Sequence, residues 1–513
     1  MIWIEPPLNL WDRSRRDVSL SSQNGFQFPE TVRTRSRFRN PIGKFRVNRT
    51  DDCIACGKCV EICPYGVHVE RRGQVFVENN YLCVGTECPE PCYKACPVQA
   101  LSVRRNPVFD TLGDFRWTNE LLASTWYMAE FGESPSAGLE YKVGNSGGGF
   151  DKLRLIFNGN RSRLEDIPDD DIDVSLELNR RDDNAYRIRI EVPVYGGGMS
   201  YGSVSVTTMV SRARAAAALG TLSCTGEGGY PDELKPYDDH MITQVATGLF
   251  GVKEETIQRV KIVEFKYAQG AKPGLGGHLL GDKVTPGVAR MREAVVGYPL
   301  FSPFPFHSVY SVEDHKKHVD WIKAINPKAL VSVKVSTPTD VDMVAVGSYY
   351  AGAHIIIHLD GSYGGTGAAP DIAKKNIAMP IEYAVPKVHR FLQEEGVRDK
   401  MTVIASGGIR TPHDVAKIIA LGADGVCTGT ADLVALECVR CQNCESGRGC
   451  ARGIATTDTE LSELMNIEWG AQRIINMYLA WRKELIRILR KLGMKSIKEL
   501  VGRTECLVHL DYM

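Results

Sequence analysis

The sequence predicts an α/β protein, a (β/α)8 barrel of the TIM type that follows a small α+β domain. Two observations predict the barrel. Beyond Tyr195, short β-branched runs alternate with helix-like stretches, and each run ends in small, polar or charged residues. A third observation predicts the small domain, because eight of the 15 cysteines lie between Cys53 and Cys96. A chain of 513 residues is long enough for both.

Composition and charge narrow the class of protein. The chain has 62 Lys+Arg against 62 Asp+Glu and is 43% hydrophobic, which is typical of a globular protein with a large core. A formal net charge of zero gives no overall field for nucleic acid or an anionic membrane. The first residues, MIWIEPPLNLWDRSRRD, lack the apolar core of a secretory signal. We therefore expect a cytoplasmic protein without nucleic-acid or membrane partners, whose cysteines are thiols or metal ligands.

The first cysteine run has the spacing of bacterial iron–sulfur ferredoxins. CIACGKCVEICP follows the pattern CxxCxxCxxxCP, in which three thiolates on one loop hold three corners of a cubane cluster. The second run, CVGTECPEPCYKACP, has a looser spacing, and in two-cluster ferredoxins each run supplies the fourth ligand of the other cluster. The crossed sets are Cys53, Cys56, Cys59 and Cys96 for one 4Fe–4S cluster, and Cys83, Cys88, Cys92 and Cys63 for the other.

A pair of zinc sites is the alternative, because zinc also accepts four thiolates. The third cysteine of each run and the following Pro64 and Pro97 are superfluous for zinc, which favours iron–sulfur clusters. The short run GQVFVE at 73–78 fits a hairpin of such a module. The small domain is therefore predicted to be ferredoxin-like.

The remaining segments follow from these two units. Residues 106–149 carry few apolar repeats and end in glycines, which indicates a linker or an irregular wrap. The charged helical tail is expected to cover the barrel or to dock a partner subunit. The predicted partition is an N-terminal extension (1–45), the ferredoxin-like domain (46–105), a linker and barrel entry (106–190), the barrel with a cysteine-rich loop (191–457) and the tail (458–513).

The barrel prediction depends on four apolar runs. They are LVSVKV at 330–335, HIIIHL at 354–359, TVIASGG at 402–408 and GVCTGT at 425–430. Helix-like segments connect the first two and the last two, and Pro412 is well placed at a helix start. These patterns predict βαβ units with strands buried on both faces.

Glycine-rich turns follow three of these runs. Residues 360–370, 406–408 and 428–430 bring backbone N–H groups to the carboxyl ends of the strands, where parallel barrels place their active sites. Such turns can cradle a phosphate, or they can simply permit tight strand-to-helix connections. Three of them at successive strand ends favour a cofactor that carries a phosphate.

Several motifs resemble one known family. PVYGGGMSYGSVS at 193–205, TGEGG at 225–229, QGAKPGLGGHLLGDKV at 269–284, DGSYGGTGAAP at 360–370 and TADLVALEC at 430–438 are similar to the flavin-binding synthase domain of glutamate synthases. With its N-terminal ferredoxin module, the chain resembles the short, archaeal-type members of that family. The long members begin with a glutaminase domain that has an N-terminal cysteine nucleophile. This chain begins Met1, Ile2, so we expect no glutaminase activity.

The resemblance implies FMN in the barrel. A cation near the pyrimidine edge of a flavin stabilises its reduced, anionic form, and Lys334 would supply it. The alternative is that Lys334 is a solvated lysine at a strand end. The residues implied for the flavin and its phosphate tail are Met199, Ser200, Gly202, Lys334, Asp360, Gly365, Thr366, Gly407, Gly408, Gly429 and Thr430.

The resemblance also implies a third iron–sulfur centre, a 3Fe–4S cluster on three cysteines after the last barrel strand. Cys438, Cys444 and Cys450 occupy those places. Cys441 is extra, and it either converts the site to a 4Fe–4S cluster or is a bystander. Zinc is again the alternative ligand.

The implied reaction is the reductive amination of 2-oxoglutarate with ammonia, through 2-iminoglutarate, to L-glutamate. Iron–sulfur clusters would deliver electrons from ferredoxin or an NAD(P)H-oxidising subunit, and ammonia would come from solution or a separate glutaminase subunit. Lys272 and Arg292 are the candidates for binding the substrate carboxylates, and Glu227 is the candidate proton donor or acceptor. His278 is the fourth candidate for the catalytic site. The alternatives are that Arg292 only forms an ion pair on a helix surface and that His278 is a loop histidine without a role.

Two other functions are possible. One is a related FMN-dependent enzyme that forms a C–N bond on another oxo acid or amine, since His278 and Leu275 differ from the Gln and Glu of the long enzymes. The other is an electron-transfer flavoprotein subunit. The retention of TGEGG, Lys272 and Arg292 favours chemistry, because an electron relay needs no dicarboxylate pocket.

Overall fold

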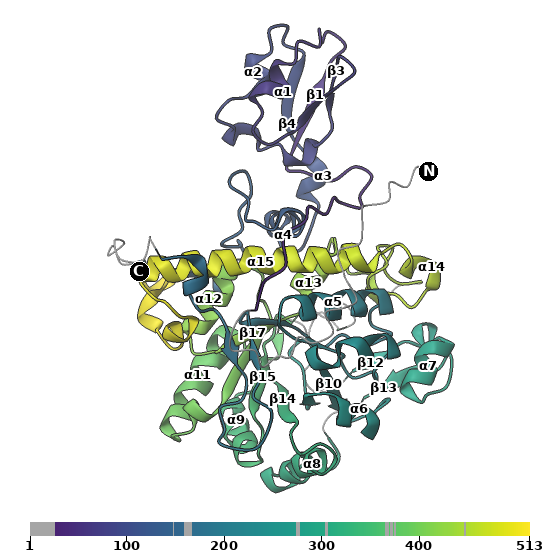
Figure 1. Ribbon diagram of the computed structural model, residues 1–513, viewed down its shortest axis with the longest axis vertical. Helices are drawn as coiled ribbons and strands as arrows, with labels where there is room; N and C mark the ends of the chain where they lie inside the picture. The colour runs from purple at the N-terminus through teal and green to yellow at the C-terminus, as the bar shows by residue number, and fades with distance from the viewer. Residues whose placement is uncertain are drawn as a thin grey trace.

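A closed barrel of parallel strands forms the body of the protein (Figure 1). The computed structural model describes residues 26–146, 148–157, 167–272, 277–302, 306–364, 369, 373, 376–445 and 448–513. Within them, eight strands close the barrel in the order β10-β11-β14-β15-β16-β17-β8-β9. Their bounds are β8 (Val194–Gly196), β9 (Ser223–Cys224), β10 (Met241–Ala246), β11 (Ile262–Lys266), β14 (Leu330–Ser336), β15 (Ile355–Asp360), β16 (Thr402–Ser406) and β17 (Gly425–Thr428). The predicted barrel is confirmed, and the four apolar runs form β14 to β17.

The strands are apolar because helices cover them from outside and side chains fill the barrel inside. All residues of β10, β11, β14 and β16 are buried. One set of side chains points outward to the helices, and the other fills the lower interior around Ile262, Leu330 and Ile404. A hairpin of β6 (Leu176–Glu177) and β7 (Arg189–Ile190) adds Leu176 and Ile190 to this interior cluster.

Helices connect the strands as the sequence predicts. They include α5 (Val206–Ala218), α6 (Glu254–Arg259), α7 (Pro286–Arg292), α8 (Val312–Ile325), α9 (Val341–Tyr350), α11 (Ile381–Glu394), α12 (Pro412–Ala420) and α13 (Thr430–Ala435). Pro412 occupies the first turn of α12, where its missing N–H costs nothing, and the Thr411 side chain accepts a hydrogen bond from the Asp414 N–H.

The long helix α15 (Ile467–Leu492) lies across the barrel, between the barrel and the N-terminal module (Figure 1). It packs against α5, α12, α13 and α4 (Asn119–Phe131), so covering the barrel is the observed role of the tail. It begins at the Asn466 cap and ends at Gly493, whose φ of 76° lies in the left-handed region. No helix in the described ranges combines the length and apolarity that a membrane span requires.

The prediction of an irregular linker over 106–149 is wrong in part. The segment contains α3 (Pro107–Asp110) and the 13-residue α4. Five consecutive residues of α4, from Leu121 to Thr125, are buried, because α15 covers one side of the helix and the N-terminal segment another. A helix that is buried on several sides has no clear 3.6-residue alternation, so its sequence does not display one.

The N-terminal module has ferredoxin-like α+β structure and stands apart from the barrel, beyond α4 (Figure 1). Strand β1 (Phe45–Arg49) pairs with β4 (Leu101–Arg105), and β2 (His68–Arg71) forms a hairpin with β3 (Gln74–Val77). The short helices α1 (Lys58–Ile62) and α2 (Cys92–Ala95) carry cysteines of the two runs. The module is joined to α4 by a Tyr81–Glu130 hydrogen bond of 2.8 Å and a Lys44–Glu120 ion pair of 2.8 Å.

Buried polar side chains of α15 fasten the N-terminal segment to the barrel. The Asn476 amide is fully buried; its nitrogen donates to the carbonyls of Val32 (2.7 Å) and Ala129 (2.9 Å), and its oxygen accepts from the Val32 N–H. The Arg473 guanidinium donates to the carbonyls of Ala435 and Thr34. These bonds connect the segment before the module to α4 and α13.

We expect Asn476→Leu to lower the free energy of unfolding by about 2 kcal/mol, because the fully buried amide loses its hydrogen bonds to the Val32 backbone and the Ala129 carbonyl, and leucine replaces none of them. Urea unfolding followed by circular dichroism measures the change. Lys316→Ala is the control, since this exposed lysine pairs with Asp320 along α8 and its effect should stay below about 0.5 kcal/mol. Equal stability of Asn476→Leu and wild type would contradict the assigned role.

Candidate active site

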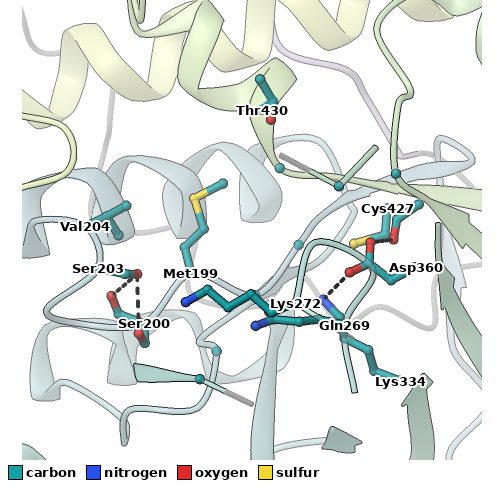
Figure 2. Close-up of a pocket in the computed structure, with 18 of the residues that line it drawn as sticks. Met199, Ser200, Ser203, Val204, Gln269, Lys272, Lys334, Asp360, Cys427 and Thr430 are labelled. Carbon is teal, nitrogen blue, oxygen red and sulfur yellow. Dashed lines mark hydrogen bonds and ion pairs between the residues drawn. The ribbon is translucent and has the colours of Figure 1, made fainter. Parts of the chain in front are cut away.

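A cavity of about 240 Å³ opens at the carboxyl ends of the barrel strands. Lys266, Asp360, Ser406 and Thr428, the last residues of β11, β15, β16 and β17, line it. Most of the site residues expected from the sequence meet here, and Figure 2 shows several of them. The expected residues that line the cavity are Met199, Ser200, Glu227, Lys272, His278, Lys334, Asp360, Gly407, Gly408, Gly429 and Thr430.

Some expected or discussed residues are not among those that line the cavity. Gly365, Thr366 and Leu275 fall outside the described residues. Gly202 is absent from the lining. It has a φ of 106°, and a Cβ there would lie 2.9 Å from the Leu279 side chain, so the glycine allows a close approach behind the wall.

Arg292 also lies behind the cavity wall. It ends α7, is buried, and its guanidinium donates hydrogen bonds of 2.9 Å to the Ser200 hydroxyl and the Tyr201 carbonyl. Burial lowers the pKa of Arg292, and the carboxylate of Glu227 opposes that shift. The helix-surface alternative is therefore wrong, and in this structure Arg292 positions Ser200, which itself lines the cavity.

The turn after β16 has backbone conformations that only glycine adopts readily. Gly407 and Gly408 have φ angles of 95° and 89°, and a Cβ on Gly407 would lie 2.7 Å from the Gly361 carbonyl. On the opposite side, a Cβ on Gly197 would lie 3.0 Å from the Cys427 sulfur. Small residues therefore leave backbone groups accessible where the strands end.

A buried ion pair supports this glycine-rich wall from outside. The Arg212 guanidinium of α5 donates to the Gly197 carbonyl and forms a 3.0 Å pair with Asp432 of α13. Asp432 also accepts hydrogen bonds from the hydroxyls of Thr428 (3.1 Å) and Tyr478 (3.0 Å). Three helices thus fix the ends of β8 and β17 relative to each other.

Lys334 and Asp360 lie side by side on the floor of the cavity (Figure 2). Their charged atoms are 3.7 Å apart, and both residues are buried. Burial lowers the pKa of Lys334, but the carboxylates of Asp360 and Glu264 outweigh it and raise the pKa above the ordinary lysine value. The alternative of a solvated strand-end lysine is wrong, and the cavity floor carries a fixed positive charge.

One wall of the cavity gathers cations and hydrogen-bonding groups. The Lys272 ammonium lies 3.0 Å from His278 Nδ1, and Lys266 forms a 3.4 Å pair with Glu227. Burial and the neighbouring Lys272 charge lower the pKa of His278, which favours the neutral ring as an acceptor from Lys272. The wall therefore offers two buried ammonium groups, a carboxylate and an imidazole.

Lys266 and Gln269 also line the cavity, and neither is among the site residues expected from the sequence. A signal was present for each. Lys266 ends the apolar run IVEFK, at the position where a parallel strand reaches the active-site face of a barrel, and Gln269 opens the QGAKPG motif.

The cysteine-rich loop lies next to the cavity. Cys444 lines it, and the Lys283 ammonium, which is buried, donates a 2.6 Å hydrogen bond to the Cys444 carbonyl. Burial raises the pKa of Cys438 to about 11, and the nearby thiols of Cys444 and Cys450 add to the shift. Cys441 is exposed, whereas the other three cysteines of the loop are half-buried.

The module cysteines separate into two groups that cross the two sequence runs. The sets that line two small cavities are Cys53, Cys56, Cys59 and Cys96 in one, and Cys63, Cys83, Cys88 and Cys92 in the other. Burial raises the pKa of Cys92 to about 12, and the thiols of Cys83 and Cys63 contribute. In the part of the chain that the structure describes, no three His, Cys, Asp or Glu side chains are gathered closely enough for a single metal ion.

A parallel barrel with a cation-lined cavity, beside a cysteine loop and a ferredoxin-like module, defines an iron–sulfur barrel oxidoreductase. Residues 158–495 match the family described as "Conserved region in glutamate synthase", and residues 48–67 match "4Fe-4S binding domain". The chain belongs to the glutamate synthase family.

Relatives agree over nearly the whole chain. A Thermotoga maritima protein described as "Archaeal-type glutamate synthase (NADPH)" is 39% identical over 492 residues, which cover 90% of this chain and 94% of that protein. An Archaeoglobus fulgidus protein described as "Archaeal glutamate synthase (NADPH)" is 36% identical over 505 residues, 91% and 94% of the two chains. A solved structure of mutant flavocytochrome b2 with pyruvate bound is 16% identical, with a TM-score of 0.44 over 70% of this chain and 76% of that chain.

Proposed function

We propose that this chain is the synthase subunit of a glutamate synthase, which aminates 2-oxoglutarate reductively to L-glutamate. The carrying observation is the cavity wall in which Lys266, Gln269, Lys272 and His278 converge above the Lys334 floor. The names of the relatives support the same activity.

The charges of the wall suit an oxo-dicarboxylate. 2-Oxoglutarate carries two carboxylates and a keto oxygen, and buried ammonium groups bind such oxygens more strongly than exposed ones. Lys272 is 3% exposed and Lys266 is 9% exposed, so both meet a ligand with little water between. We propose that Lys272 binds the substrate. Lys266 pairs with Glu227 and orients the carboxyl group of Glu227.

Proton transfer accompanies both steps of the reaction. Ammonia adds to the keto carbon and water leaves, which gives 2-iminoglutarate. Two electrons with one proton then reduce the imine carbon, and a second proton reaches the nitrogen. The Lys272 ammonium can polarise the departing oxygen, because its His278 contact holds it in the cavity. Glu227 lines the same cavity and can donate a proton to the substrate or accept one from it.

The barrel residues fit FMN. The glycine turn at Gly407 and Gly408 leaves space that a Cβ would fill, and the Lys334 cation lies on the floor beside it. We propose that Met199 and Ser200 contact the flavin and that Gly408, Gly429 and Thr430 lie at its phosphate tail. When bound, FMN interconverts single electrons and hydride, which imine reduction requires.

The cysteine groups fit three iron–sulfur clusters. The thiolates of one cubane bind different iron atoms, which suits sulfurs that surround a small cavity. We propose a 4Fe–4S cluster for each crossed set of the module. We assign the third cluster to Cys438, Cys444 and Cys450, because the Cys444 and Cys450 thiols lie near Cys438 and, together with burial, raise its pKa, and we place Cys441 outside it. Such clusters and free thiols suit the reducing cytoplasm.

The proposed partners follow from what the cavity and clusters need. Electrons would enter at the module from ferredoxin or an NAD(P)H-oxidising subunit, and ammonia would come from solution or a separate glutaminase subunit. The relatives that carry NADPH in their names favour the NAD(P)H-oxidising subunit.

The deciding experiment is anaerobic. The cluster-loaded protein is reduced chemically, 2-oxoglutarate and ammonium are added, and flavin reoxidation is followed while glutamate is assayed. We expect reoxidation with stoichiometric glutamate. Reoxidation with a different oxo acid or amine only would contradict the substrate, and no response to any such pair would leave an electron relay as the function.

A further inference from the structure

A layer of buried charged and polar side chains crosses the barrel directly under the cavity. Glu264 of β11, Lys334 of β14, and His358 and Asp360 of β15 point into the interior, and all are 8% exposed or less. Ser332 and Ser406 join them from β14 and β16. Below this layer the interior is apolar, so on that side the charges of the layer can be compensated only by one another.

A register shift in β15 places His358 in this layer. Ile355 belongs to the apolar interior, so strict alternation would send His358 and Asp360 outward to the helices. The pairing with both neighbouring strands shifts between Ile356 and His358, and beyond the shift His358 lies opposite Lys334 and Ile404. The bulge therefore turns His358 and Asp360 inward.

Hydrogen bonds determine where one proton of His358 lies. The Ser406 hydroxyl is 2.6 Å from Asp360 Oδ1, and a carboxylate only accepts, so Ser406 donates its single proton there. His358 Nε2 lies 2.6 Å from the same hydroxyl oxygen. Because that oxygen has no second proton to give, His358 Nε2 must donate to it.

The second ring nitrogen faces a carboxylate. His358 Nδ1 lies 3.5 Å from Glu264 Oε2 and has no hydrogen-bond partner among the described residues. The Gln244 amide and the Ser332 hydroxyl each donate a hydrogen bond to Glu264, so both of its carboxyl oxygens act as acceptors. A bare lone pair on Nδ1 would therefore oppose a carboxylate in a buried site, whereas an N–H would be attracted to it.

A charge count leads to the same state. Two carboxylates, Glu264 and Asp360, face one ammonium, Lys334. The other groups from neighbouring strands are neutral: Gln244 is an amide, and burial raises the pKa values of Tyr195, Cys224 and Cys427 above the ordinary values. A second proton on His358 makes the layer neutral.

We propose that His358 is an imidazolium that forms a neutral quartet with Lys334, Glu264 and Asp360, and that it acts as a positioning residue for the cofactor site. It holds Asp360 through Ser406, and Asp360 holds Lys334. Its positive charge lies at the cavity, which it lines, and favours the reduced, anionic form of a bound flavin. The flavin part of this inference rests on the proposed function, whereas the charge state does not.

Two variants and their combination test the charge state. His358→Gln keeps a donor for Ser406 but removes the charge, and Glu264→Gln removes the opposite charge. Urea unfolding of the holoenzyme should show that each single variant is destabilised. The double variant should be more stable than His358→Gln, with an equilibrium constant of unfolding at least tenfold smaller. A double variant that is no more stable than His358→Gln would overturn the imidazolium.

The midpoint potential of the flavin gives an independent readout. His358→Gln should shift the flavin equilibrium at least tenfold toward the oxidised form, about 30 mV for two electrons, and Glu264→Gln should shift it the opposite way. His354→Gln is the matched control, because His354 is also buried but bonds Asp183 outside the cavity, and it should leave the potential unchanged. An unchanged potential in His358→Gln would overturn the role toward the flavin. Substrate is absent, so failure here is distinct from failure of glutamate formation.

Discussion

Replacing Cys63 by alanine is expected to eliminate the cluster of the second cysteine run and to spare the cluster of its own run. Cys63 directly follows α1 and lines the cavity of Cys83, Cys88 and Cys92, whereas Cys59 within α1 lines the other cavity. A cubane that loses one of four thiolates is exposed to solvent and becomes labile. Iron analysis should show the loss of one cluster, and electron paramagnetic resonance of the reduced protein should retain the signal of the other. Turnover with a protein electron donor should fall to the background, because electrons cannot pass through the module.

Matched cysteine variants make this result interpretable. Cys96→Ala should eliminate the opposite cluster, because Cys96 lines the cavity of Cys53, Cys56 and Cys59. Cys506→Ala should leave the iron content unchanged, since Cys506 lines neither cavity. If Cys63→Ala instead removed the cluster of its own run, the crossed assignment would be wrong.

Lys272→Ala is expected to reduce glutamate formation by at least 10²- to 10³-fold while FMN remains bound. The ammonium is buried beside His278 in the cavity wall, so its loss removes a charge-assisted hydrogen bond where the keto oxygen develops negative charge. Lys334 and Asp360, on the floor of the cavity, form a separate ion pair. We therefore expect the flavin content of Lys272→Ala to be unchanged.

Steady-state assays of glutamate and the flavin absorption spectrum measure the two parts of this prediction. Lys317→Ala provides the control, because that lysine is exposed on α8, where it pairs with Asp314. Full turnover in Lys272→Ala would exclude this lysine from the mechanism, and loss of FMN would show that it supports the cofactor instead.

Much of the barrel could be predicted because its signals are local. Strands β14 to β17 are continuous β-branched runs bounded by turns, and Pro412 marks the start of α12 wherever that helix packs. Helix α4 could not be found in this way, since its neighbours on several sides are α15 and the N-terminal segment, more than 300 and about 90 residues away in sequence.

The site was predictable in its residue types but less so in its geometry. Glycine turns, Lys334 and Lys272 lie at the cavity because they follow strand ends, which converge on one face of every parallel barrel. Arg292 is the last residue of helix α7. The sequence does not show whether its side chain lines the cavity or, as observed, supports Ser200 from behind the wall, because this depends on how α7 packs. Lys266 was recognisable only by its place at the end of the apolar run IVEFK, because no motif with a distinctive spacing surrounds it.

The sequence by itself determined the parallel barrel, the ferredoxin-like module and the glycine-rich strand ends. All three arise from spacings of a few residues, over which covalent geometry and backbone preferences act directly. Only the tertiary structure decided the place of Arg292 behind the cavity wall and the inward turn of His358 through the bulge in β15. These outcomes depend on register and on contacts between segments far apart in the chain, which the pattern of any one segment does not contain.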